Sequence, residues 1–511
     1  MSTSANYYIT TPIYYVNDVP HIGHAYTTIA CDVLARFMRL DGKNVFFLTG
    51  TDEHGQKVEK SAVEAGESPQ DFTNRVSGRF RALTESLNSS NDDFIRTTEL
   101  RHKTASQSIW NALVENGDIY LGSYAGWYSV RDEAYFSESE LIKNSKGDFE
   151  APSGSAVEWL EEPSYFFRLS RWQKPLLKLY EESPEFILPR SRRNEVISFV
   201  KNGLNDLSIS RTTFSWGVDV PDDKKHVMYV WLDALINYLS AIGYPDKKYK
   251  KFWPADVHIV GKDIIRFHAI YWPAFLLAAE IEPPKRIFAH GWWTNEGKKI
   301  SKSLGNVIDP NTIIKEYGLD TLRFFLLKEV PFGNDGDFSK KSLERRINND
   351  LANDLGNLVQ RVLTIINKNL EGKLNKIKQI KDNDKKLCQY PEQILKKIEE
   401  NYEKQEFHKV IESIWKLISE ANKYVDENAP WKLLKDNKER AGDVLNILVI
   451  IIAKIAIFLA PIMPDVSENI LNKIGLSIKN LTIKDITRDD FLNIAYKIKK
   501  PEIIFQKIDN A

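Results

Sequence analysis

The sequence predicts an α/β protein in which a mostly parallel sheet is split by an inserted domain and followed by an all-α bundle. Short apolar runs of strand length alternate with helical patterns, which is typical of a buried parallel sheet. These runs lie at residues 45–48, 227–230, 257–260 and 287–289. Residues 118–225 instead alternate aromatic and turn residues, and every segment after residue 346 has a helical pattern.

These changes of pattern divide the chain into five expected segments. Residues 1–117 form the first half of the sheet domain, 118–225 an inserted connective domain without a zinc knuckle, and 226–293 the second half. Residues 294–345 form a connector with a loop, and 346–511 an α-helical domain.

Composition limits the class of protein. The chain has 511 residues and a formal net charge of 0, so a nucleic-acid partner would need a local basic face. The two cysteines, Cys31 and Cys388, exclude a disulfide framework and a four-cysteine zinc site. They fit a reducing cytoplasm, and the polar opening MSTSANYY does not resemble a signal segment.

One segment approaches the length of a membrane span. Residues 444–463 are almost entirely apolar, but Lys454 lies in the middle and prolines follow at the end. We therefore expect a buried helix of the bundle and no membrane partner.

The stretch YYITTPIYYVNDVPHIGH, residues 7–24, predicts a strand, a break and the start of a helix. His21 and His24 are three residues apart, so both rings lie on one helix face. Gly23 leaves room for a flat ring, and the helix start offers N–H groups to an anion. The pattern indicates a binding site for a triphosphate, which we call the phosphate seat. Two alternatives remain for the two histidines: a metal-binding pair and plain polar surface.

A second stretch, TNEGKKISKSLGN, contains Lys299, Ser301 and Lys302. Alone, such a loop is usually a solvated turn. Together with HIGH at 21–24, its KISKS motif resembles the second signature of class I aminoacyl-tRNA synthetases. The contexts GTDEHGQK, YVWLDALINY, GKDIIRFHAIYWPAFL and HGWWTNEGKKISKSLGN resemble the methionyl-tRNA synthetase family, from about residue 6 to residue 465.

The resemblance implies a Rossmann-type catalytic domain that uses ATP, with Mg²⁺ bound to its phosphates. It implies catalytic roles for His21, His24, Lys299 and Lys302. The implied ATP-binding residues are His21, Gly23, His24, Gly261, Asp263, Trp293, Lys299, Ser301 and Lys302.

The resemblance also implies a methionine pocket, in which Asp52 holds the ammonium group. The other implied pocket residues are Ile13, Tyr15, Trp231, Ala234, Leu235, Tyr238 and His268. We expect the Tyr238 hydroxyl to face the sulfur. Other roles stay open: Asp52 as a helix cap, the 231–238 stripe as core, and His268 as a satisfied core group.

For the helical domain, the resemblance implies that Asn357, Arg361 and Trp431 read a CAU anticodon, unless they are a surface pair and a core anchor. Relatives with zinc carry cysteine pairs in the insertion, and this sequence has none, so no structural zinc or other metal ligand is expected. An aromatic core is expected instead, formed by Trp159, Tyr165, Phe166, Phe167 and Trp172.

The implied function is a ligase that activates L-methionine with ATP and charges tRNA(Met). We expect a cytoplasmic monomer, since no oligomer-binding barrel is appended. Three alternatives remain: another class I aminoacyl-tRNA synthetase, a HIGH-type nucleotidyltransferase, and a non-catalytic tRNA-binding protein. The bundle after residue 346 disfavours the second, and the two intact signature loops disfavour the third.

Overall fold

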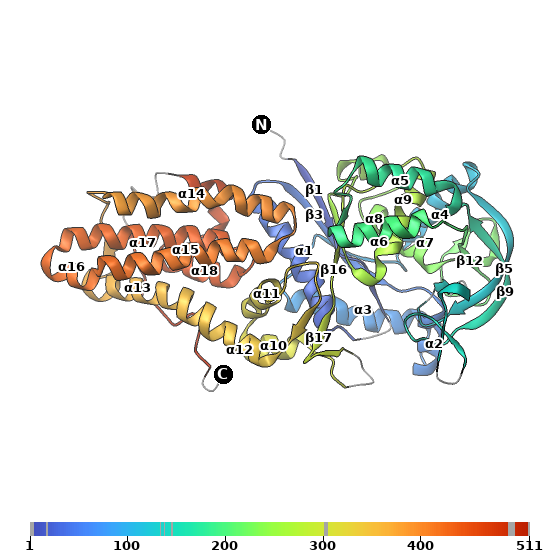
Figure 1. Cartoon of the computed structure of the whole chain (residues 1–511), viewed down its shortest axis with the longest axis horizontal. Coiled ribbons are helices and arrows are strands. Elements are labelled where there is room, and N and C mark those ends of the chain that lie inside the picture. Colours follow the sequence, from blue (N-terminus) through green and yellow to red (C-terminus); the bar gives the residue numbers. More distant parts are fainter. Residues whose placement is uncertain are drawn as a thin grey trace. The chain divides into compact units, whose positions relative to one another are not determined.

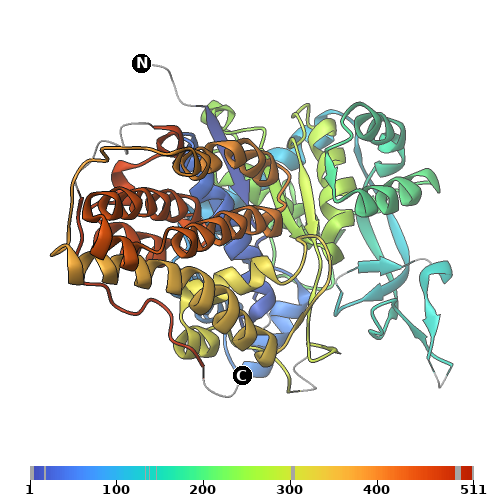
Figure 2. The ribbon, with the colours of Figure 1, turned by 60° about the vertical axis from the view of Figure 1, so that its left-hand side comes forward.

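The computed structural model describes residues 5–16, 19–132, 134–136, 138–144, 147–300, 305–488 and 496–508. The chain divides into two compact units, which we call the sheet unit and the bundle unit (Figures 1 and 2). The sheet unit comprises Asn6–Cys31 and Val45–His290, and the bundle unit comprises Met1–Ala5, Asp32–Asn44 and Gly291–Ala511. The division falls inside helix α1 (Ile22–Leu40).

A seven-stranded sheet organises the sheet unit, with strand order β10-β16-β15-β1-β3-β2 and β4 beside β3. Parallel pairing joins β10 to β16, β16 to β15, β15 to β1, β2 to β3 and β3 to β4. The bounds are β1 (Asn6–Thr10), β2 (Tyr14–Tyr15), β3 (Asn44–Asp52), β4 (Asp93–Arg96), β10 (Ile187–Leu188), β15 (Val257–Gly261) and β16 (Ile287–His290). The parallel α/β fold predicted from the sequence is confirmed.

Three details differ from the prediction. The apolar run at 227–230 was expected to belong to this sheet, but β14 (Asp223–Met228) pairs antiparallel with short strands in a separate three-stranded sheet, and α7 begins at Val230. Residues 7–16 were expected to form one strand, but β1 and β2 are separate and pair with different neighbours. Pro12 lies between them and has no N–H for a ladder, so the chain changes partners there. Strand β4 was not predicted, because four residues are too few for a clear period.

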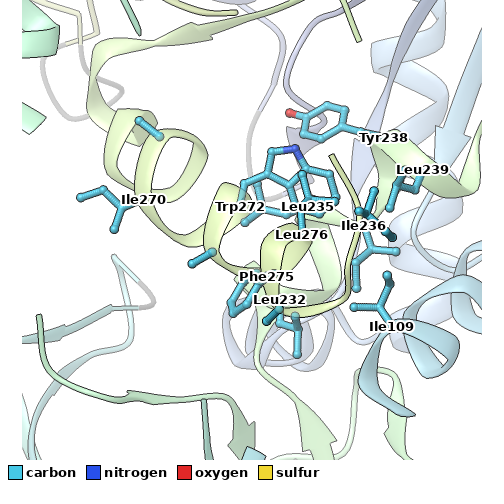
Figure 3. Packing of buried hydrophobic residues seen from close by; sticks show 14 of the residues in the cluster. Ile109, Leu232, Leu235, Ile236, Tyr238, Leu239, Ile270, Trp272, Phe275 and Leu276 are labelled. Carbon is cyan, nitrogen blue, oxygen red and sulfur yellow. The ribbon is translucent and has the colours of Figure 1, made fainter. Parts of the chain in front are cut away.

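Together with the strands, the helices of the sheet unit form its apolar core. They are α2 (Gln56–Ala65), α3 (Pro69–Ser86), α4 (Leu100–Glu115), α5 (Gln173–Glu182), α6 (Arg190–Lys201), α7 (Val230–Leu235), α8 (Asn237–Ser240) and α9 (Trp272–Ala278), with a π-helical turn at Phe267–Tyr271. Figure 3 shows Leu232 and Leu235 of α7 close to Phe275 and Leu276 of α9, all of them buried. This packing anchors α7, which carries predicted pocket residues.

The insertion is built mainly from antiparallel strands. The long strands β5 (Ile119–Ser129) and β9 (Glu158–Phe167) pair with each other, and β6 (Ala134–Phe136) and β11 (Leu207–Ser208) flank them. Smaller sheets contain β7 (Ile142–Lys143), β8 (Phe149–Glu150), β12 (Ser210–Arg211), β13 (Asp219–Val220) and β14 (Asp223–Met228). Strand β10 lies within the expected insertion but belongs to the main sheet.

The expected aromatic core of the insertion is wrong for Trp159. Its side chain is 58% exposed, whereas that of Phe167 is fully buried. The two residues lie on the same face of β9 but at opposite ends of the strand, and only Phe167 packs against the core residue Phe275, with ring centroids 4.8 Å apart. Trp159 lies opposite Trp127 of β5, and their rings meet edge to face.

A polar cluster occupies the region where the resemblance would place cysteine pairs in zinc-containing relatives. The Asp132 carboxylate accepts hydrogen bonds from the hydroxyls of Ser129 (3.2 Å), Ser153 (2.5 Å) and Ser155. Within the part of the chain that is described, no group of three or more His, Cys, Asp or Glu side chains is arranged to hold a metal. Hydrogen bonds therefore connect this part of the insertion.

Helices dominate the bundle unit. They are α10 (Pro310–Tyr317), α11 (Leu319–Lys328), α12 (Lys340–Arg346), α13 (Asn357–Asn369), α14 (Asp382–Glu403), α15 (Phe407–Asn428), α16 (Pro430–Asp436), α17 (Lys438–Leu459) and α18 (Pro464–Lys473), with a π-helical stretch at Ile347–Gly356. Figures 1 and 2 show α14, α15 and α17 running alongside one another. The expectation of helix alone is wrong at β20 (Lys373–Leu374) and β21 (Tyr496–Lys497), which pair.

Two features hold this unit together. Helix α17 is long and apolar enough to cross a membrane, but 94% of its most apolar window is buried, as the core position expected for it requires. The buried Arg323 guanidinium contacts the Asp32 carboxylate of α1 (2.7 Å) and donates to the Ile462 and Pro461 carbonyls (2.8 and 2.9 Å). These bonds satisfy a charge that would otherwise be costly to bury.

We predict that the insertion needs no zinc. The purified protein should contain less than about one-tenth equivalent of zinc, and chelation should leave its melting temperature unchanged. Asp132→Ala should lower the melting temperature, because three hydroxyls lose their acceptor, at a cost of about 1–3 kcal/mol. Stoichiometric zinc in elemental analysis would contradict the prediction.

Candidate active site

The HIGH segment lies at the start of α1, where two backbone N–H groups orient its histidine rings. The His21 N–H donates to Nδ1 of His24 (3.1 Å), and the Gly23 N–H donates to Nδ1 of His21 (3.0 Å). Because both Nδ1 atoms accept, each neutral ring carries its hydrogen on Nε2. The ring centroids are 4.0 Å apart, so the two Nε2–H groups belong to one small site.

The protonation state of this pair favours an anionic ligand. Burial and the neighbouring His21 hold the pKa of His24 well below its usual range, so His24 is neutral at physiological pH. An Nε2–H group donates to phosphate oxygen and cannot ligate a metal. A Cβ on Gly23 would lie 2.9 Å from Cε1 of His21, so any larger residue there would displace the His21 ring from this position. The geometry therefore favours the phosphate seat over the metal pair.

Asp52 lies at the carboxyl end of β3, where open α/β sheets bind ligands. It is 7% exposed and pairs in register with Tyr15 of β2. Helix α2 starts after Gly55 and has no side-chain cap, so Asp52 does not act as its cap. The neighbouring Glu53 accepts from Nε and Nη2 of Arg96 (2.6 and 2.9 Å), which holds this strand end in place.

The side chains predicted to surround the methionine thioether, which we call the thioether slot, are partly or fully buried. Ile13, Tyr15 and Trp231 are partly buried and pack against one hydrophobic cluster that contains Leu235 and Tyr238. Ala234, Leu235 and Tyr238 are at most 4% exposed, which fits the core reading of the stripe. The 231–238 stripe is divided between two helices, because α7 ends at Leu235 and α8 begins at Asn237.

A hydrogen-bond chain fixes Tyr238 and His268. Nδ1 of His268 lies 3.0 Å from the Ile264 carbonyl, which can only accept, so Nδ1 carries a hydrogen. Burial lowers the pKa of His268 to about 4, and the neutral ring then accepts the Tyr238 hydroxyl at Nε2 (2.7 Å). The hydroxyl hydrogen that we expected to face the sulfur is therefore donated to His268 in this structure.

Gly261 is the last residue of β15, on the same sheet as Asp52, and Asp263 follows two residues later. A Cβ at Gly261 would lie 2.5 Å from a carboxylate oxygen of Asp263. Glycine at 261 thus allows the exposed Asp263 carboxylate to fold back over the backbone at this strand end. Carboxylates at this position of α/β folds bind ribose hydroxyls.

The KISKS region belongs to the bundle unit. Strands β17 (Trp293–Asn295) and β18 (Lys298–Lys299) form a hairpin through Glu296 and Gly297, which both have positive φ. The backbone of Lys299 pairs with Thr294, while Ser301 and Lys302 lie outside the described residues. Trp293 packs against Phe325 and is only 5% exposed, so its indole has little surface for adenine.

Two of the three predicted anticodon residues are in contact. The Arg361 guanidinium lies over the Trp431 ring (5.1 Å to its centroid) and donates to Asp426 (2.6 Å). Trp431 is 39% exposed, so it is not a core anchor. Asn357 is exposed on α13, four residues before Arg361. An exposed indole beside a guanidinium can stack an unpaired base.

Comparisons with known proteins identify the family. The family model described as tRNA synthetases class I (M) matches residues 7–363, and the anticodon binding domain of methionyl tRNA ligase matches residues 376–511. The chain belongs to the methionyl-tRNA synthetase family. A Methionine--tRNA ligase of Rickettsia felis is 56% identical over 98% of each chain, and that of Brucella suis is 52% identical over 94% of each.

Solved structures of methionyl-tRNA synthetases share the fold. The Mycobacterium tuberculosis enzyme in complex with methionyl-adenylate has a TM-score of 0.94 and 45% identity, covering 98% of this chain and 99% of that one. The free form from the same organism has a TM-score of 0.89 and 42% identity, covering 99% of each.

The structure also places residues at the site that the sequence reasoning missed. Phe267 stacks on Trp231 with 3.6 Å between the ring centroids and 6° between the planes. Trp272 lies beside Tyr238, as Figure 3 shows, with centroids 5.9 Å apart. Both residues are close to His268 in sequence, so its helical neighbours could have suggested them. Nothing local in the sequence signals the contact with Trp231.

We predict that His24→Ala lowers the rate of adenylate formation by at least about 10², the usual effect of one lost transition-state donor. The methionine KM should change little. His24→Gln is the matched control, because its amide can place an N–H near the lost Nε2 and should recover part of the rate. ATP–pyrophosphate exchange measures both variants, and near-normal exchange by His24→Ala would refute the role.

Proposed function

We propose that this chain joins L-methionine to the α-phosphate of ATP and transfers the methionyl group to the 3′-terminal adenosine of tRNA(Met). The proposal is carried by the pair of neutral Nε2–H donors of His21 and His24 at the start of α1. They lie in the same compact unit as Asp52 and Trp231, two of the predicted methionine-binding residues. The family to which the chain belongs performs this activity, and two relatives are named for it.

Methionine would bind with its ammonium at Asp52 and its thioether between Ile13, Tyr15 and Trp231. A buried carboxylate at a strand end suits an ammonium, and an aromatic and aliphatic slot suits a polarizable sulfur. Ala234, Leu235, Tyr238 and His268 would form the deeper wall. Because Tyr238 donates to His268, the hydroxyl oxygen and the neutral imidazole form a fixed polar wall beside the sulfur.

Activation needs orientation more than acid–base chemistry. The methionine carboxylate is already a nucleophile and attacks the α-phosphate, and pyrophosphate leaves. ATP would arrive as its magnesium complex. His21 and His24 would donate to the triphosphate as its charge shifts, Gly23 would leave room for it, and Gly261 and Asp263 would hold the ribose. Lys299, Ser301 and Lys302 would bind the leaving pyrophosphate.

The bundle unit would select the tRNA. Arg361 and Trp431 would stack on an unpaired base, and Asn357 would bond to a base edge of the CAU anticodon. The net charge of 0 requires such local contacts, because no global field attracts RNA. We propose a monomer acting in the cytoplasm.

The decisive test of this function is ATP–pyrophosphate exchange with each of the twenty amino acids. We expect exchange with methionine, and rates at least about 10²-fold lower for the others at equal concentration. Maximal exchange with a different amino acid would indicate another class I specificity. Exchange with none, in a folded protein, would leave a tRNA-binding role.

A second prediction tests the anticodon surface. Trp431→Ala should lower aminoacylation of tRNA with a CAU anticodon by about 10–10², from the loss of one stacked base. Exchange without tRNA should stay within about twofold, because the methionine residues lie in the other compact unit. Trp431→Phe keeps a ring and should retain most of the activity. Equal loss of both reactions in a folded Trp431→Ala would show that Trp431 is no dedicated reader.

A further inference from the structure

A fully buried carboxylate in the sheet unit joins three elements. Oδ2 of Asp233 lies 2.6 Å from Nδ1 of His54, and Oδ1 lies 2.6 Å from Nε2 of His102. Asp233 belongs to α7, His102 to α4, and His54 follows the end of β3. All three side chains are at most 1% exposed. The proposed chemistry does not use this cluster.

The Asp233 carboxylate accepts one hydrogen bond from the His54 ring and one from the His102 ring. Burial by itself would raise the pKa of Asp233, but His54 and His102 outweigh it and hold that pKa below its usual range. An ionised carboxylate can only accept, so each histidine donates an N–H. Such charge-assisted bonds are short and directional, as the two distances are.

The bond between His54 and Asp233 connects the two halves of the proposed methionine site. His54 lies two residues after Asp52, the proposed ammonium ligand. Asp233 lies two residues after Trp231 and directly before Ala234 and Leu235. One side-chain bond therefore fixes the ammonium end relative to the thioether end. The Trp216 indole, which donates to the Glu53 carbonyl (2.6 Å), meets the His54 ring edge to face.

A buried charged cluster is a costly way to hold two elements together. Apolar side chains of similar volume would often stabilise the fold as well or better. Hydrogen bonds instead fix distance and direction, which substrate positioning requires to within a fraction of an ångström. The cluster thus gives more to the geometry of the site than to the stability of the fold.

We propose that Asp233 and His54 are positioning residues that set the separation between the ammonium site at Asp52 and the thioether slot at Trp231. This inference rests on the proposed function. Methionine spans both halves of its site, so loosening the link weakens methionine binding. At the proposed phosphate seat, backbone N–H groups at the start of α1 orient the rings of His21 and His24. ATP binding therefore does not depend on the bond between His54 and Asp233.

The test compares two substitutions of His54 in the full-length chain. His54→Phe keeps an aromatic ring beside Trp216 but removes the donor. His54→Asn places an amide N–H near the position of Nδ1 and can still donate to Asp233. ATP–pyrophosphate exchange gives kcat and the KM for methionine and for ATP, after thermal melting has confirmed folding.

We expect His54→Phe to raise the methionine KM at least about tenfold, the usual effect of losing a hydrogen bond to a charged group. The ATP KM should stay within about twofold, and His54→Asn should keep the methionine KM within about threefold of the unsubstituted chain. If His54→Phe does not fold, His54→Leu takes its place with the same expectation.

Three results would overturn the inference. One is an unchanged methionine KM in folded His54→Phe, and another is an equal rise of both KM values, which indicates a merely structural role. The third is a His54→Asn variant as impaired as His54→Phe. Failure of the proposed function looks different, because the unsubstituted chain would then show no methionine-dependent exchange at all.

Discussion

Parallel pairing in the seven-stranded sheet is the constraint on which the site depends. Parallel strands bring their carboxyl ends to one edge, and β1 with β15 and β2 with β3 pair in this way. Tyr15, Asp52 and Gly261 are the last residues of β2, β3 and β15. Segments from distant parts of the sequence thus supply one sheet edge with an acid, an aromatic ring and a glycine.

Buried polar side chains then fix the positions of the residues at this edge of the sheet. The Arg96 guanidinium pairs with the Glu53 carboxylate. The Asp233 carboxylate bonds to the rings of His54 and His102, and the His268 ring accepts the Tyr238 hydroxyl. Each contact satisfies a group whose desolvation would otherwise cost free energy, and each fixes a direction that apolar packing alone leaves free. The hydrophobic cluster supplies the stability, and the polar bonds set the positions of side chains at the proposed methionine site.

The bundle unit combines a tightly buried interior with an exposed aromatic side chain. Helix α17 is buried almost throughout its length, and the satisfied Arg323 guanidinium joins α11 to the second half of α1. This rigid interior leaves Trp431 exposed at the start of α16, with Arg361 over its ring. Pro430 begins that helix after Ala429 in the left-handed region, so the backbone turns just before the indole. A packed helical interior thus carries an exposed aromatic ring, a feature that suits the proposed recognition of single-stranded RNA.

Local sequence determined the α/β class, the helical bundle, the strands at 257–260 and 287–289, and the HIGH and KISKS stretches, because each depends on neighbouring residues alone. It did not determine the exchange of partners at Pro12, the strand β4 or the exposure of Trp159. Only the tertiary structure pairs His54 with Asp233, 179 residues apart, donates the Tyr238 hydroxyl to His268 and buries Trp293. Spacing along the chain predicts periodicity within one element. It carries no information on which side chains meet across elements, because packing settles that among many competing contacts of similar free energy.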